Sequence, residues 1–123
     1  MIDTRFRFYY WGPFLTKYKL PKETIKELLK NSKNKKDYGH VLAGIIKGQY
    51  NPPHVHSTDL SCVAFLKIPK GLKKENKNFK GCSGGPGSLE FRYGEAAGFS
   101  FRTSETFLPE EGDFFIFPSK LQH

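Results

Sequence analysis

The sequence contains few cysteines, fewer acidic than basic side chains, and no long apolar run. Its 123 residues include only two cysteines, Cys62 and Cys82, so a disulfide framework is excluded. No apolar run approaches the roughly 20 residues of a membrane span, and the first residues lack the apolar stretch of a signal peptide. We therefore expect a cytoplasmic protein that has no membrane partner.

The motifs of several enzyme classes are also missing. There is no Gly-x-Ser-x-Gly nucleophile elbow. The glycine-rich residues 84–87 lack the lysine and the strand-to-helix setting of a phosphate loop. Cys62 lies inside an apolar run and is predicted to be a core residue. Cys82 lies in a glycine-rich stretch near Lys80, where we expect an inert thiol, with a reactive thiol as the alternative.

Basic side chains outnumber acidic ones by 20 to 12, which gives a net charge of +8. Much of the excess lies in the lysine-rich residues 17–36 and 67–80. A basic balance favours an anionic partner, but neither stretch carries a nucleic-acid-binding motif. Lysine runs of this kind are usually solvated surface. We therefore expect no nucleic-acid partner, and a lysine-based nucleic-acid module is the third hypothesis.

Length and aromatic content predict one folded domain over residues 1–123. A helix is expected over residues 21–31, because Pro21 suits a first turn and apolar residues then recur at helical spacing. Strands are expected over residues 5–10, 41–46, 60–68, 88–93, 99–101, 105–108 and 113–117. Short strands with Gly and Pro turns between them predict an antiparallel sandwich or barrel. Residues 70–86 are expected to form a long loop, which we predict acts as a lid or faces the substrate.

Histidines are the residues best suited to chemistry. His54 and His56 follow the stiff Asn51-Pro52-Pro53 turn, and residues two apart in a strand point to the same side. Both imidazoles can therefore face one metal ion. Two ligands do not make a stable site, but His123 follows a further apolar strand and can supply a third. His40 stands alone, and we expect a structural or surface role for it.

The order of the motifs carries a resemblance. Residues 48–56, which read Gly-Gln-Tyr-Asn-Pro-Pro-His-Val-His, resemble a Gly-Gln-Tyr-…-His-x-Asp stretch of iron(II)/2-oxoglutarate oxygenases of the prolyl-hydroxylase type. Residues 109–123 contain Pro-x-x-Gly-Asp and then Phe-Pro-Ser-x-x-x-His, and they resemble the segment that supplies the distal histidine of those enzymes. With Leu60-Ser61 and the Gly-Pro-Gly-Ser-Leu-Glu-Phe run at 85–91, the pattern is similar to that of oxygenases common in marine bacteria and their phages. It covers about residues 42–123.

The resemblance implies a mainly β fold, a double-stranded β-helix (jelly-roll, cupin-like) with the N-terminal helix packed on it. It implies that His54, His56 and His123 are the catalytic iron ligands. It also implies Fe(II) as the metal and 2-oxoglutarate as the co-substrate, with Tyr50 lining the pocket.

Two departures from the family pattern bear on the site. His56 stands where the wider superfamily has aspartate, and three histidines would also suit zinc. Asp59 is a candidate for the missing carboxylate, although a regular strand would point it away from the pair. The position of a co-substrate-binding tyrosine in the family is held by Ile45.

The sequence ends at His123, whereas related proteins continue into a strand that brings an arginine to the co-substrate. We therefore expect a chain that lacks its last strand, with this arginine absent and with His123 as a ligand on an untethered end. A missing strand also leaves an exposed sheet edge, which favours pairing with a second copy.

The leading hypothesis is an iron(II)/2-oxoglutarate-dependent dioxygenase, a hydroxylase acting on a small molecule or a peptide. The absent arginine leaves open whether this chain is active. The alternative is a non-catalytic β-barrel, metal-binding or metal-free, that serves as a binding or structural protein.

Overall fold

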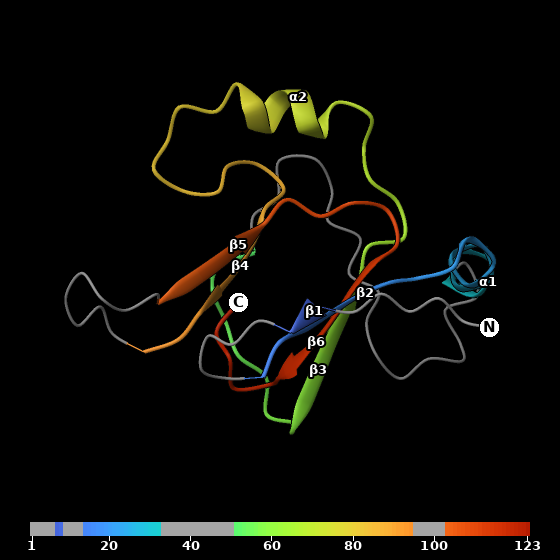
Figure 1. Ribbon diagram of the computed structural model, residues 1–123, viewed down its shortest axis with the longest axis horizontal. Coiled ribbons are helices and arrows are strands. Elements are labelled where there is room, and N and C mark those ends of the chain that lie inside the picture. Colours follow the sequence, from blue (N-terminus) through green and yellow to red (C-terminus); the bar gives the residue numbers. More distant parts are fainter. Residues whose placement is uncertain (1–6, 9–13, 33–50, 95–102) are drawn as a thin grey trace.

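The computed structural model describes residues 7–8, 14–32, 51–94 and 103–123, which form two antiparallel sheets and two helices (Figure 1). The first sheet has the strand order β1 (Arg7–Phe8), β2 (Thr16–Lys19), β6 (Asp113–Pro118) and β3 (Leu60–Ala64). The second pairs β4 (Leu89–Arg92) with β5 (Ser104–Phe107). The helices are α1 (Lys22–Ser32) and α2 (Leu72–Lys77). The strands expected at 41–46 and 99–101, together with His40, lie outside the described residues.

The mainly antiparallel β fold is confirmed, and α1 begins and ends within one residue of its expected bounds. The strand expected over residues 60–68 stops at Ala64. Whether the two sheets close into a double-stranded β-helix stays a prediction. Neither helix in the described part of the chain is long and apolar enough to cross a membrane.

Two elements differ from the sequence-based expectation. The stretch expected as a loop over residues 70–86 contains helix α2, whose lysines and Glu75 are good helix formers. Strand β2 was not expected, because its Thr-Lys-Tyr-Lys alternation suggests an exposed surface. Its two lysines instead share the face of β6 that carries Asp113 and Phe115, since Lys17 pairs with Phe115 and Lys19 with Asp113.

The two sheets face each other across a core of phenylalanine rings. Phe91 of β4 is fully buried, and its ring centroid lies 4.9 Å from that of Phe117 and 5.9 Å from that of Phe115. Phe107 of β5 lies 5.0 Å from Phe115. Because aromatic pairs at this spacing add to the free energy of apolar burial, these contacts dock one sheet on the other.

The prediction that Cys62 is a core residue is wrong, because its side chain is exposed. Ser61 pairs with Phe117 and Val63 with Phe115, so these two residues share the inward face of β3. Successive strand residues point to opposite faces, and Cys62 therefore points outward. The polar Ser61 takes the inward position because its hydroxyl has a buried partner there, the Oγ of Ser119.

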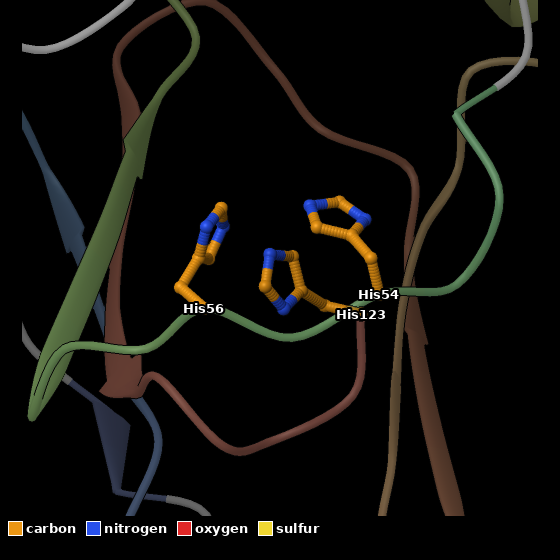
Figure 2. Close-up of side chains that lie close together, drawn as sticks. All are labelled: His54, His56 and His123. Atoms are coloured by element: carbon orange, nitrogen blue, oxygen red, sulfur yellow. The ribbon is translucent and has the colours of Figure 1, made fainter.

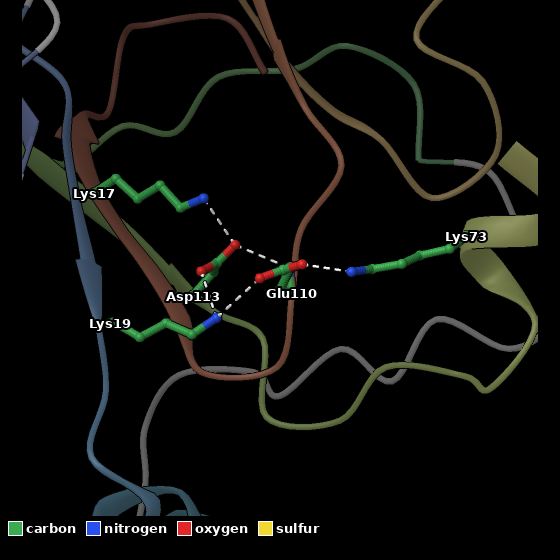
Figure 3. A network of polar contacts seen from close by, with 5 residues as sticks. All are labelled: Lys17, Lys19, Lys73, Glu110 and Asp113. Atoms are coloured by element: carbon green, nitrogen blue, oxygen red, sulfur yellow. Dashed lines mark hydrogen bonds and ion pairs between the residues drawn. The ribbon is translucent and has the colours of Figure 1, made fainter. Parts of the chain in front are cut away.

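A buried carboxylate joins β2, β6 and the turn before β6 (Figure 3). The side chain of Asp113 is only 3% exposed, and its two oxygens accept hydrogen bonds from Lys17 Nζ at 2.9 Å and Lys19 Nζ at 3.0 Å. The backbone N–H of Glu110 donates a further bond at 2.9 Å. Glu110 in turn pairs with Lys73 of α2, so the network extends from β2 to the helix that follows β3.

Gly112 fixes where α1 packs. Its φ of +87° is a conformation that favours glycine. A side chain there would also meet Ile25 Cδ1 at 3.0 Å and the carbonyl oxygen of Leu20 at 3.3 Å. Ile25 is buried, so the tight turn before β6 is the surface on which the helix rests.

We predict that Asp113→Asn lowers the free energy of unfolding at pH 7 by roughly 1–3 kcal/mol, because both lysines lose a buried charged acceptor. Burial raises the pKa of Asp113, but the bonds from Glu110, Lys17 and Lys19 outweigh it and hold the pKa below its ordinary value of 3.8. The contribution is therefore complete above pH 4 and is lost as the pH falls through the lowered pKa.

Urea unfolding of the parent and the variant at pH 7, 5 and 3 measures this effect. The difference should be equal at pH 7 and 5 and smaller at pH 3. Glu110→Gln is the matched control, because the Glu110 side chain is 55% exposed and surface pairs contribute little. A difference that did not change between pH 5 and pH 3 would contradict the assigned role of the carboxylate.

Candidate metal centre

Two segments far apart in the sequence lie side by side and carry the three histidines. The backbone N–H of His54 donates to the carbonyl of His123 at 2.9 Å, and the N–H of His123 donates back to the carbonyl of His54 at 3.1 Å. The N–H of His56 donates to the carbonyl of Ser119 at 2.9 Å. Residues 51–59 do not form a regular strand. The N–H groups of His54 and His56 nevertheless both donate to the segment 119–123, as alternate residues do in a β-ladder.

The expectation that His123 sits on an untethered end is wrong. His123 forms a reciprocal pair of backbone hydrogen bonds with His54. The preceding residue, Gln122, is held by the second sheet, because the Arg92 N–H of β4 donates to the Gln122 carbonyl at 2.8 Å. The segment 119–123 therefore lies between the segment with His54 and His56 and strand β4. Backbone hydrogen bonds to the His54 segment and to β4 fix the position of the backbone that carries the His123 imidazole.

Figure 2 shows the three imidazoles converging on one point. One potential ligand nitrogen from each of His54, His56 and His123 lies within 4.8 Å of the others. The ring centroids are 4.5 Å apart for His54 and His123, 5.0 Å for His54 and His56, and 5.1 Å for His56 and His123. Three nitrogens at this spacing can hold a single metal ion from one side.

Backbone carbonyls set the tautomer of two of the rings. The Nδ1 of His54 lies 3.0 Å from the carbonyl oxygen of Pro52, and the Nδ1 of His123 lies 2.9 Å from that of Leu121. A carbonyl oxygen can only accept, so each Nδ1 must carry the proton. The lone pair is then on Nε2, ready for a metal, as in most histidine sites. Among the described residues, no group hydrogen-bonds to the ring of His56.

The ring of His123 packs against the aromatic core. Its centroid lies 4.6 Å from that of Phe117 and 6.2 Å from that of Phe91. Burial lowers the pKa of His123 below its ordinary value of 6.5, and the neighbouring His54 and His56 lower it further. The hydrogen bond to the Leu121 carbonyl opposes this, but the net shift is downward. The ring is therefore neutral at pH 7, which is the form that binds metal.

The other predicted site residues lie elsewhere or outside the described chain. Asp59 is not part of the three-residue group, and it is exposed. Its carbonyl instead accepts the Ser119 N–H at 3.0 Å. Tyr50 and Ile45 lie outside the described residues.

Arg92 is the arginine whose side chain the structure describes, and it alternates along β4 with Phe91, the residue that contacts His123. Its guanidinium pairs with Glu90 on the far face. The one arginine side chain that the structure describes therefore points away from the three imidazoles.

The donor set fits a catalytic divalent ion. Three imidazole nitrogens would bind such an ion from one side and would leave further positions for water, co-substrate or oxygen. Iron(II) and zinc both bind imidazole, so this set of side chains does not distinguish one metal from the other. Ser119, whose carbonyl accepts the His56 N–H, was not among the expected site residues. The signal for it was the Phe-Pro-Ser run, which ends four residues before His123.

We predict that Co²⁺ or Zn²⁺ raises the melting temperature of the protein at pH 7.5 and that a chelator reverses the increase. An ion present at 100 times its Kd adds about 2.7 kcal/mol to stability. The increase should disappear in His54→Ala and His123→Ala. It should also shrink as the pH falls, because protons compete with the ion for imidazole nitrogens. Differential scanning fluorimetry measures it. An undiminished increase in both variants would show that the ion binds elsewhere.

Comparison with known proteins places the chain in a family. The family described as "Putative 2OG-Fe(II) oxygenase" matches residues 42–123, which is two thirds of the chain and includes all three histidines. No curated protein and no solved structure matches the chain. The matched region includes β3 to β6, which build the core beneath the imidazoles, and it includes the last of the three histidines. The protein therefore belongs to this family of 2OG-Fe(II) oxygenases.

Proposed function

We propose that the protein is an iron(II)- and 2-oxoglutarate-dependent oxygenase that hydroxylates a small molecule or a peptide. The observation that carries the proposal is the convergence of His54, His56 and His123 in a chain of this family. In the proposal these three side chains hold Fe(II), and Tyr50 lines the co-substrate pocket.

We also propose that the two sheets are parts of a double-stranded β-helix. The support is that they face each other across a shared aromatic core. The segment that carries His123 is bonded on one side to β4 and on the other to the segment that carries His54. The metal centre would then lie at the junction of the two sheets, where both hold its ligands.

The described residues have distinct parts in such a site. The Pro52 and Leu121 carbonyls keep the Nε2 lone pairs of His54 and His123 free for the metal. Phe91 and Phe117 form an apolar wall behind His123 and exclude water from that side. His56 is exposed, so the substrate would approach from its side. Bound iron together with 2-oxoglutarate supplies the oxygen-activating chemistry.

The co-substrate part of the proposal rests on the family alone. A carboxylate of 2-oxoglutarate calls for a cation, and guanidinium pairing is the strongest choice. Arg92 faces away from the imidazoles, and Lys17 is paired with Asp113. Arg92 and Lys17 are therefore both engaged elsewhere, and neither is proposed to bind the far carboxylate.

An anaerobic titration with Fe(II) and 2-oxoglutarate tests the proposal. We expect a visible charge-transfer band from the chelate bound to iron at the protein. The band should be absent in His54→Ala and His56→Ala, because two imidazoles hold the ion too weakly. Absorbance spectra measure the binding of 2-oxoglutarate to the iron, and equilibrium dialysis measures the binding of iron to the protein.

Asp59→Asn is the matched control, because it removes the nearby carboxylate and leaves all three imidazoles. The band should persist in this variant. Loss of the band in Asp59→Asn would make a carboxylate the third ligand and overturn the all-histidine assignment. Iron binding without any band would remove 2-oxoglutarate from the proposal, and no binding of any divalent ion would favour the non-catalytic barrel.

A further inference from the structure

Three hydroxyl groups form a cluster beside the metal centre. The Ser119 Oγ lies 2.7 Å from the Thr58 Oγ1 and 2.7 Å from the Ser61 Oγ, and Ser119 is fully buried. Thr58 belongs to the segment that carries His54 and His56, Ser61 lies in β3, and Ser119 follows β6 at the start of the segment that leads to His123. We call these three residues the hydroxyl latch.

The protons of the latch can be assigned in one consistent direction. The Thr58 hydroxyl donates to the Leu60 carbonyl at 3.3 Å, so its single proton is used. The Ser119 hydroxyl must then donate to Thr58, and the Ser61 hydroxyl must donate to Ser119. Each hydroxyl has a partner for its proton, and the chain of donors ends on a carbonyl oxygen. The latch is thus a complete network, and such networks favour one arrangement.

Ser119 fastens the ligand segment with its backbone as well. Its carbonyl accepts the His56 N–H at 2.9 Å, and its N–H donates to the Asp59 carbonyl at 3.0 Å. Four hydrogen bonds therefore join this one residue to residues 56–61. The segment it holds includes the ligand whose ring has no hydrogen bond of its own within the described structure.

We infer that the hydroxyl latch positions His56 and so sets the metal affinity of the centre, an inference that rests on the proposed function. His54 and His123 are oriented by carbonyls bonded to their own rings. His56 has no such bond, and its orientation follows from the backbone around it. Thr58 is two residues away and is tied through Ser119 to the base of the His123 segment. Ser119, Thr58 and Ser61 are positioning residues, because they act on His56 through hydrogen bonds to the segment that carries it.

Thr58→Val is the sharpest test, since it removes the hydroxyl and keeps the shape. We expect Co²⁺ to bind about 10- to 100-fold more weakly than to the parent, the usual effect of losing an outer-shell partner. The visible ligand-field spectrum at saturation should also change, because the cobalt loses one well-placed nitrogen. Thr58→Ser keeps the hydroxyl and should restore both. Ser119→Ala should act like Thr58→Val, because each substitution removes two of the hydroxyl hydrogen bonds.

A stability control separates positioning from general destabilisation. Ile25→Ala truncates a buried side chain at helix α1, which packs on the Gly112 turn. It should lower the melting temperature of the metal-free protein and leave the Co²⁺ affinity and spectrum unchanged. Equal Co²⁺ affinity in the parent, Thr58→Val and Ser119→Ala would overturn the latch and leave the proposed metal centre standing. Absence of Co²⁺ binding to the parent itself would overturn both.

Discussion

The antiparallel pairing of the segment 54–59 with the segment 119–123 is the constraint on which the candidate site depends. It supplies the reciprocal bonds between His54 and His123, and it places His56 opposite Ser119. Backbone hydrogen bonds of this kind do not depend on side-chain identity. They hold the two segments together without using the imidazoles, which stay free to bind a metal ion. The phenylalanine core beneath holds the sheets at the distance at which this pairing can form.

Much of this arrangement could be predicted from sequence. The apolar run over residues 113–117 predicted a strand, and β6 forms there with alternating buried and partly buried residues. The histidine spacing also led to a candidate metal centre. Local patterns carry this information because strand periodicity and the reach of a His-x-His pair are set by nearby residues alone. Family membership then supported the oxygenase interpretation.

The rest could not be predicted because it depends on partners far away in the sequence. The lysines of β2 lie on the sheet face that carries Asp113, which pairs with both of them. The sequence of β2 alone assigns them to solvent. Cys62 looks buried in an apolar run, but the register of β3 with β6 turns Ser61 inward instead. The tethering of His123 likewise arises from His54 and Arg92, whose positions no local pattern reveals.

The separation of the ligands along the chain has a consequence for folding. Between His56 and His123 the backbone passes through β3, β4, β5 and β6, so an ion bound to both would close a loop that contains most of the described sheets. Such a closure restricts the unfolded chain in the way a disulfide does, and the restriction grows with loop length. In a protein whose two cysteines are both free, the cofactor would thus also be a removable cross-link.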